Sequence, residues 1–222
     1  MAKKNSSGKA IISTIFEYFV LFCVAIIISI FLRAFVFQPF YIPSSSMENT
    51  FKINDTIAVN KISARFGKIN RGDIVVFKDP DHWVPKSENI NSGNWIDSIM
   101  YKFDLSDSPD QVYLIKRVIG IEGDVVECKG QGYPITINNK PVQEEYLKEG
   151  QASKLPFKVK VPKNRIWVMG DNRNNSGDSR YHQNNGYMGT VSVDSVVGKP
   201  FAILWPFSRI QILYGTDAFS KI

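Results

Sequence analysis

The segment Tyr113-Leu114-Ile115-Lys116-Arg117-Val118 lies inside an apolar run that extends from residue 112 to residue 121. The run is rich in β-branched and aromatic side chains and ends among glycines, which predicts a strand. Neighbouring side chains of a strand point to opposite faces. Lys116 and Arg117 should therefore diverge, one toward a functional site and the other away from it.

Similar short runs, bounded by turn residues, recur about every ten residues along the chain. They comprise residues 55–60, 73–77, 158–161, 166–169 and 191–197, and a hairpin over residues 135–142. This spacing predicts a mainly β fold, a barrel or a sandwich. Residues 78–111 interrupt the pattern with many polar side chains, and we expect a long loop there with a short helix over residues 95–103.

An apolar segment over residues 10–32 precedes all of these runs. As a helix, its 23 residues would span about 35 Å, enough to cross a hydrocarbon core of about 30 Å. The segment is too long for a cleaved signal peptide, and no small-x-small cleavage site follows it. We therefore expect a single retained transmembrane helix.

Positive charges flank this segment unequally. Three lysines precede it within residues 1–9, whereas only Arg33 follows closely. The positive-inside rule then predicts a cytoplasmic tail at residues 1–9 and an extracytoplasmic domain at residues 33–222.

The net charge of +6 and the sequence pI of about 9.2 suit an anionic membrane surface as well as nucleic acid. No basic run interleaved with aromatic residues occurs, so we expect no nucleic-acid partner. Phe35, Phe37, Phe40 and Tyr41 directly follow the apolar segment, and aromatic side chains prefer the lipid interface. Membrane lipid is therefore an expected partner, and burial of the four rings in a core is the alternative.

Neither a disulfide nor a metal site is expected. Cys23 lies in the apolar segment and Cys128 in the soluble part, so the two should not meet. An EF-hand loop beginning at Asp171 would need glycine at position 176 and glutamate at position 182, where Ser176 and His182 stand.

The segment Ile42-Pro43-Ser44-Ser45-Ser46-Met47 offers hydroxyl nucleophiles shortly after the apolar segment. A serine hydroxyl reacts only when a base takes its proton. The chain has two histidines, His82 and His182, and both have the settings of surface or structural residues. Lysine is the known alternative base. Lys116 lies in an apolar strand, where burial would lower its pKa by several units and favour the neutral amine.

The serine segment at residues 42–47, the lysine strand at residues 113–118 and the polar loop Gly170–Arg180 follow one another in that order. Together with the apolar segment they resemble type I signal peptidase, the membrane serine protease that removes secretory signal peptides. The resemblance extends to about Phe207. It implies that residues 127–163 form a small inserted subdomain.

The resemblance also implies the roles of the reacting groups. Ser46 corresponds to the nucleophile and Lys116 to the general base. The Ser44 hydroxyl and the Ser46 backbone amide would stabilise the oxyanion. Relatives often carry glycine at position 45, and Ser45 should be harmless there unless the backbone needs a positive φ.

Three further residues receive supporting roles by the same resemblance. Ser176 would hydrogen-bond the lysine amine and orient it. Asp178 and Arg180 would form a structural ion pair, with Arg117 nearby.

The resemblance finally implies a membrane-bound serine endopeptidase that needs no metal or cofactor and cleaves secretory preproteins at the extracytoplasmic face. An extended substrate would pair with residues 38–46 and with the residues preceding Lys116. Two shallow apolar pockets would select small side chains at the first and third positions before the cut. One alternative is a catalytically silent anchored scaffold or sortation protein, against which the retained serine and lysine argue. The other is a self-cleaving regulatory protease, against which the anchor argues.

Overall fold

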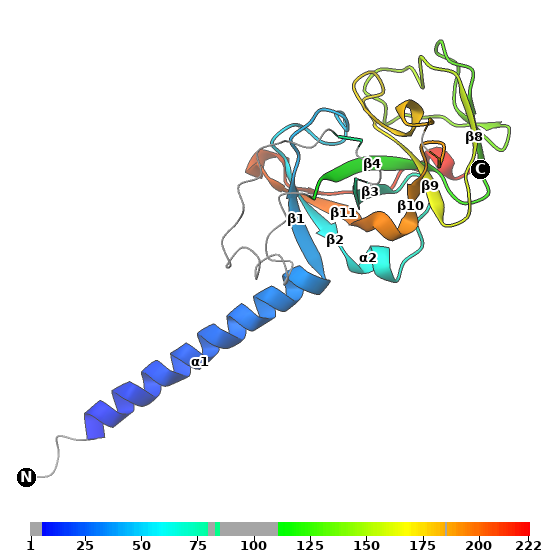
Figure 1. Cartoon of the computed structure of the whole chain (residues 1–222). Helices are drawn as coiled ribbons and strands as arrows, with labels where there is room; N and C mark the ends of the chain where they lie inside the picture. The colour runs from blue at the N-terminus through cyan, green and yellow to red at the C-terminus, as the bar shows by residue number, and fades with distance from the viewer. Residues whose placement is uncertain (1–5, 80–82, 85–110, 185) are drawn as a thin grey trace, which may run out of the picture. The chain divides into compact units, whose positions relative to one another are not determined.

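The computed structural model describes residues 6–79, 83–84, 111–184 and 186–222 (Figure 1). They form two compact units, the N-terminal helix and the domain that begins at Phe37. The short helix predicted over residues 95–103, most of the predicted 78–111 loop and His82 lie outside the described residues.

The helix α1 (Ser6–Phe35) contains an apolar segment, Ile11–Arg33, with a mean hydropathy of 2.7. None of this segment is buried within the protein. A helix that is apolar on all sides requires either a protein core or a membrane around it. Its 23 residues are enough to cross a bilayer core, as expected for residues 10–32.

The domain is mainly β, as predicted, and every strand pair in it is antiparallel. The larger sheet has the order β1-β2-β11-β3-β4-β9-β10, with β12 paired to β11. Its strands are β1 (Phe37–Tyr41), β2 (Thr56–Asn60), β3 (Ile74–Lys78), β4 (Tyr113–Gly120), β9 (Arg165–Met169), β10 (Val191–Ser192), β11 (Val196–Trp205) and β12 (Gln211–Ile212). Short helical turns lie between some of them, α2 (Ile62–Arg65), η1 (Ser179–Tyr181), η2 (Val193–Ser195) and η3 (Phe207–Arg209), and η4 (Asp217–Phe219) follows β12.

Two strands that the sequence pattern did not predict each contain a proline. Pro39 lies in β1, which is an edge strand and therefore tolerates a missing N–H group. Pro200 lies in β11 at a shift of register against β2, where the ladder is already interrupted. The single strand predicted over residues 191–197 is wrong, because the turn η2 divides it between β10 and β11.

The smaller sheet has the order β7-β6-β5-β8, from β5 (Val125–Cys128), β6 (Thr136–Ile137), β7 (Lys140–Pro141) and β8 (Phe157–Lys160). The predicted hairpin is present, and Asn138 and Asn139 at its turn have φ values of 51° and 69°, as a tight two-residue turn requires. In the described part of the chain, this sheet shares its core with the larger one. Its buried side chains pack in one cluster with Ile119 of β4 and Trp167 of β9.

Candidate active site

The serine segment follows β1 and is held by apolar side chains on both sides. Ile42 and Met47 are fully buried, and Phe51 packs in the same cluster. The Phe51 N–H donates to the Met47 carbonyl at 2.9 Å, which closes a helical turn directly after Ser46. Ser46 is thereby fixed at the start of this turn, with 7% of its surface exposed.

Lys116 lies on β4, and its amine reaches Ser46. The Lys116 Nζ atom is 2.8 Å from Ser46 Oγ and also donates to the Ile115 carbonyl at 3.1 Å. The lysine side chain is only 3% exposed. Burial lowers its pKa from 10.5 to about 8, although the negative charges of Asp178 and Asp171 act in the opposite direction. The structure therefore pairs a hydroxyl with an amine whose pKa lies well below that of a solvated lysine.

The neighbouring serines lie close to this pair. Ser44 Oγ is 3.4 Å from Ser46 Oγ. Ser45 is not in the left-handed backbone region, so the backbone does not require glycine at this position. The Asn175 side-chain amide donates to Ser45 Oγ at 2.7 Å, and that of Asn172 donates to the Ser45 carbonyl at 3.0 Å. These bonds attach the Gly170–Arg180 loop to the serine segment.

Asp178 and Arg180 form an ion pair at the end of that loop. Arg180 Nε lies 2.8 Å from Asp178 Oδ1, and both side chains are buried. Burial alone would raise the pKa of Asp178, but the hydrogen bonds and charge of Arg180 and the backbone N–H of Gly170 lower it overall. The pair is therefore ionised and holds the loop closed.

Arg117 does not join this pair. Its guanidinium binds Asp171 through two hydrogen bonds of 2.8 and 2.6 Å, and it donates to the Gly72 carbonyl at 2.9 Å. Lys116 and Arg117 thus diverge as adjacent strand residues should. Sequence reasoning gave no partner to Asp171, although its place in the polar loop was a usable signal.

The structure differs from the expectation for Ser176. Its hydroxyl is buried and makes no hydrogen bond with Lys116 or with any other described residue. It lies close enough to the Asp178 carboxylate to lower the pKa of that group, but outside hydrogen-bond geometry. Ser176 and Ser46 both approach Gly170, where an added Cβ would be 2.3 Å from Ser176 Oγ and 2.4 Å from the Ser46 carbonyl oxygen. Only glycine fits between them.

The residues around the pair line a groove of about 270 Å³ with a mainly apolar surface. Its walls are residues 40–44 on one side and residues 112–116 on the other, with Ile57, Val76 and Val84. Among the described residues, Leu114, Ile115 and Lys116 of β4 pair with β3 and with no other strand, since pairing with β9 begins at Arg117. In this part of the structure, the groove therefore has a strand edge without a strand partner next to Lys116.

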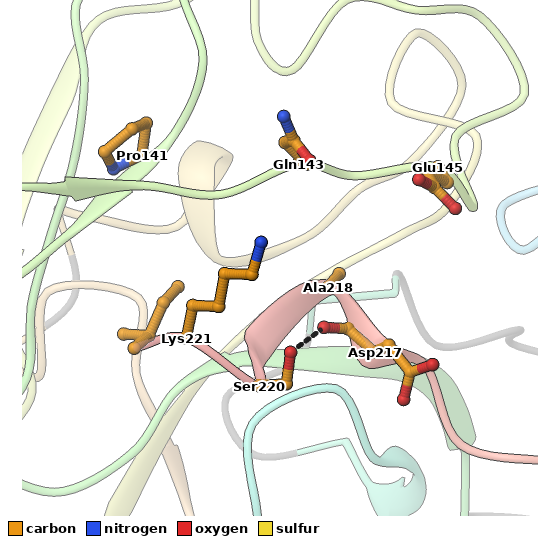
Figure 2. A pocket seen from close by; sticks show the side chains of 8 residues that line it. Pro141, Gln143, Glu145, Asp217, Ala218, Ser220 and Lys221 are labelled. Carbon is orange, nitrogen blue, oxygen red and sulfur yellow. Dashed lines mark hydrogen bonds between the residues drawn. The ribbon is translucent and has the colours of Figure 1, made fainter.

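A second hollow, of about 370 Å³, lies between the residues after β7 and the C-terminal residues (Figure 2). It is lined by Pro141, Gln143, Glu145, Asp217, Ala218, Ser220, Lys221 and Ile222. It shares no lining residue with the groove, so we do not place the chemistry there.

His182 is not a partner of the Ser46–Lys116 pair. Its ring stacks on Trp83, with the ring centroids 4.3 Å apart and the planes 5° from parallel. Among the described residues, no three His, Cys, Asp or Glu side chains are grouped so that they could hold a metal ion.

Comparisons with known proteins point to one family. The sequence model of the family described as "Signal peptidase, peptidase S26" matches residues 15–205. A "Signal peptidase I" of Mycobacterium tuberculosis is 36% identical over an alignment of 232 positions, gaps included, that covers 94% of this chain and 78% of the relative. A "Probable signal peptidase I-2" of Synechocystis sp. is 36% identical over 189 residues, which cover 85% and 72% respectively.

Among solved structures, a crystal structure of a signal peptidase I from Enterococcus faecalis matches 60% of this chain and 96% of its own, at 24% identity and a TM-score of 0.38. The family match begins within the apolar helix and includes the serine segment, the lysine strand and the polar loop. The chain belongs to the signal peptidase family, peptidase S26.

Proposed function

We propose that this serine peptidase is membrane-anchored and cleaves signal peptides from secreted preproteins, with Ser46 as nucleophile and Lys116 as general base. The observation that carries the proposal is the 2.8 Å contact between Ser46 Oγ and the buried Lys116 amine. The relatives' names, signal peptidase I, support the substrate class.

The neutral Lys116 amine takes the Ser46 proton as the hydroxyl oxygen attacks the scissile carbonyl. With a pKa of about 8, about a tenth of the amines are neutral at pH 7. The Ser46 N–H, which has no acceptor among the described residues, and the Ser44 hydroxyl donate to the developing oxyanion. The protonated lysine then gives its proton to the leaving amine, and water attacks the acyl-enzyme in the second half of the reaction.

The substrate binds in the groove as an added strand. The edge at residues 114–116, which has no second strand partner among the described residues, supplies backbone hydrogen bonds, and alternate side chains enter the apolar part of the groove. Small side chains at the first and third positions before the cut fit a shallow hollow of this size.

The helix α1 anchors the chain, with residues 1–9 in the cytoplasm and the domain on the extracytoplasmic face.

The domain also contacts lipid. It exposes large apolar side chains along one continuous part of the chain: Phe201, Leu204, Trp205, Phe207, Ile210, Ile212 and Tyr214. The rings of Phe37 and Tyr41 in β1 are exposed as well. Trp and Tyr favour the bilayer interface, where preproteins emerge.

The test is cleavage of a purified preprotein by the full chain in detergent, followed by mass measurement and N-terminal sequencing of the product. One cut after the signal peptide is expected, and Ser46→Ala and Lys116→Ala should each yield no product. Ser220→Ala, an exposed hydroxyl near the C-terminus, is the matched control and should cleave normally. Absence of any cut by the unmodified chain would favour the silent scaffold, and near-normal cleavage by either site variant would refute the dyad.

A further inference from the structure

Tyr146 follows β7, contacts the chain segments that carry Ser46 and Lys116, and is connected through Glu144 to the loop that carries Ser176. We propose that Tyr146 is a positioning residue for the catalytic pair and acts through Arg117. The inference rests on the proposed function, because it concerns the same reaction.

The ring of Tyr146 holds the guanidinium of Arg117 by its flat face. Arg117 Cζ lies 4.1 Å from the ring centroid, which is a cation–π contact. The edge of the same guanidinium is bound to Asp171 by two hydrogen bonds. Arg117 is adjacent to Lys116 on β4, so the ring fixes the orientation of the residue next to the proposed base.

The hydroxyl of Tyr146 connects it to the polar loop. It donates to Glu144 Oε1 at 2.7 Å, and Glu144 forms a buried ion pair with Arg173. Arg173 Nε in turn donates to the Gly170 carbonyl at 3.0 Å. Burial and the Glu144 carboxylate raise the pKa of the Tyr146 hydroxyl well above its usual value, so the hydroxyl remains protonated and remains a donor.

The backbone of Tyr146 connects it to the serine segment. Its carbonyl accepts a hydrogen bond of 3.0 Å from the side-chain amide of Asn49, three residues after Ser46. Phe219 of η4 stacks against the Tyr146 ring, with 6.3 Å between the ring centroids. The chain before Tyr146 lies across the second hollow from η4, as Gln143 and Glu145 show in Figure 2. The ring is therefore held from the C-terminal side as well.

These contacts predict an effect on the protonation of Lys116. Two carboxylates raise its pKa: Asp178, which is paired with Arg180, and Asp171, which is paired with Arg117. Loosening Arg117 leaves the Asp171 charge less compensated, so the ammonium form of Lys116 gains stability. Loss of the Tyr146 ring should therefore raise the pKa of Lys116. Because Tyr146 does not line the groove, substrate affinity should change little.

The test compares Tyr146→Leu with Tyr146→Phe in full-length enzyme cleaving a preprotein across a pH series. Leucine removes the π face of the ring, so kcat should fall roughly tenfold while KM stays within about twofold. The ascending limb of the pH–rate profile, the range in which the rate rises with pH, should move to higher pH. Phenylalanine keeps the face and should keep the limb in place. Tyr133→Leu is the control, since this exposed tyrosine lies beneath Lys129 on the smaller sheet and should change nothing.

An unmoved limb and unchanged kcat in folded Tyr146→Leu would overturn the inference, as would equal losses in the leucine and phenylalanine variants. If Tyr146→Leu does not fold, Arg117→Lys removes the planar contact while keeping the charge, and it should move the limb in the same direction. An unmoved limb in Arg117→Lys would then refute the role. All of these comparisons are made against an unmodified chain that cleaves the preprotein. If the unmodified chain does not cleave, the proposed function fails, and that result is distinct from a failure of the role of Tyr146.

Discussion

Replacing Lys116 with methionine should stabilise the folded protein at neutral pH while abolishing cleavage. Methionine keeps most of the length of the lysine side chain and removes the charge. The lysine is buried, and its pKa falls from 10.5 to about 8 on folding. One pKa unit corresponds to about 1.4 kcal/mol, so the buried ammonium costs about 3 kcal/mol of stability.

The pH dependence follows from the direction of this change. Below pH 8 both the folded and the unfolded chain carry the proton on Lys116, so the whole cost is present. Between about pH 8 and pH 10.5 the folded chain loses the proton first, so the cost disappears as pH rises. The free energy of unfolding of Lys116→Met should therefore exceed that of the unmodified chain most at pH 6–7. This difference in stability should vanish toward pH 10.5.

Urea unfolding of the full chain in detergent, followed by tryptophan fluorescence, measures the free energy of unfolding at each pH. About 3 kcal/mol corresponds to an increase in Tm of about 6–12 °C for a domain of this size. Lys158→Met is the matched control, because the Lys158 side chain is 66% exposed and its removal should change stability little. A Lys116→Met variant that is less stable than the unmodified chain at pH 6–7 would show that the buried ammonium is not destabilising.

Three further substitutions test the packing of Ser176, the Asp178–Arg180 ion pair and the fit of Gly170. Ser176→Ala should slow turnover while leaving residual activity, because the Ser176 side chain packs against Gly170 beside Ser46 and makes no hydrogen bond with Lys116; loss of all activity would give the hydroxyl a direct chemical role. Asp178→Ala leaves the Arg180 guanidinium buried without its carboxylate, so stability should fall by about 3–5 kcal/mol in thermal unfolding; a normal Tm with no activity would instead place Asp178 in the chemistry. Gly170→Ala puts a methyl group 2.4 Å from the Ser46 carbonyl oxygen, so it should lower kcat/KM more than tenfold; near-normal kinetics would mean that the loop can move away.

The local pattern of the sequence was enough to predict much of the fold. The β-rich content of residues 113–118 predicted β4, and the alternation of a strand correctly separated Lys116 from Arg117. Patterns failed where tertiary context decides. The pattern did not predict β1 or the part of β11 that contains Pro200; β1 is an edge and β11 is irregular at its proline, so both strands accept a residue without an N–H group.

The contacts between site residues that are far apart in the chain were harder to predict from the sequence. The motifs identified Ser46 and Lys116, which are 70 residues apart in the chain, only because a family resemblance joined them. No motif pointed to Asp171 as the partner of Arg117. Tyr146 lies in a polar stretch without periodicity, and its contacts with Arg117 and Asn49 depend on how the smaller sheet packs on the larger one.

The pH dependence of preprotein cleavage tests the lysine mechanism most directly. For the unmodified full chain, kcat/KM should rise with pH through an apparent pKa near 8, because Lys116 must lose its proton to act as base. The same ascending limb should remain when His82 and His182 are both replaced by alanine. A limb that is lost in the double-histidine variant, or one that lies near the pKa of a solvated lysine, would contradict the proposal that a buried Lys116 activates Ser46.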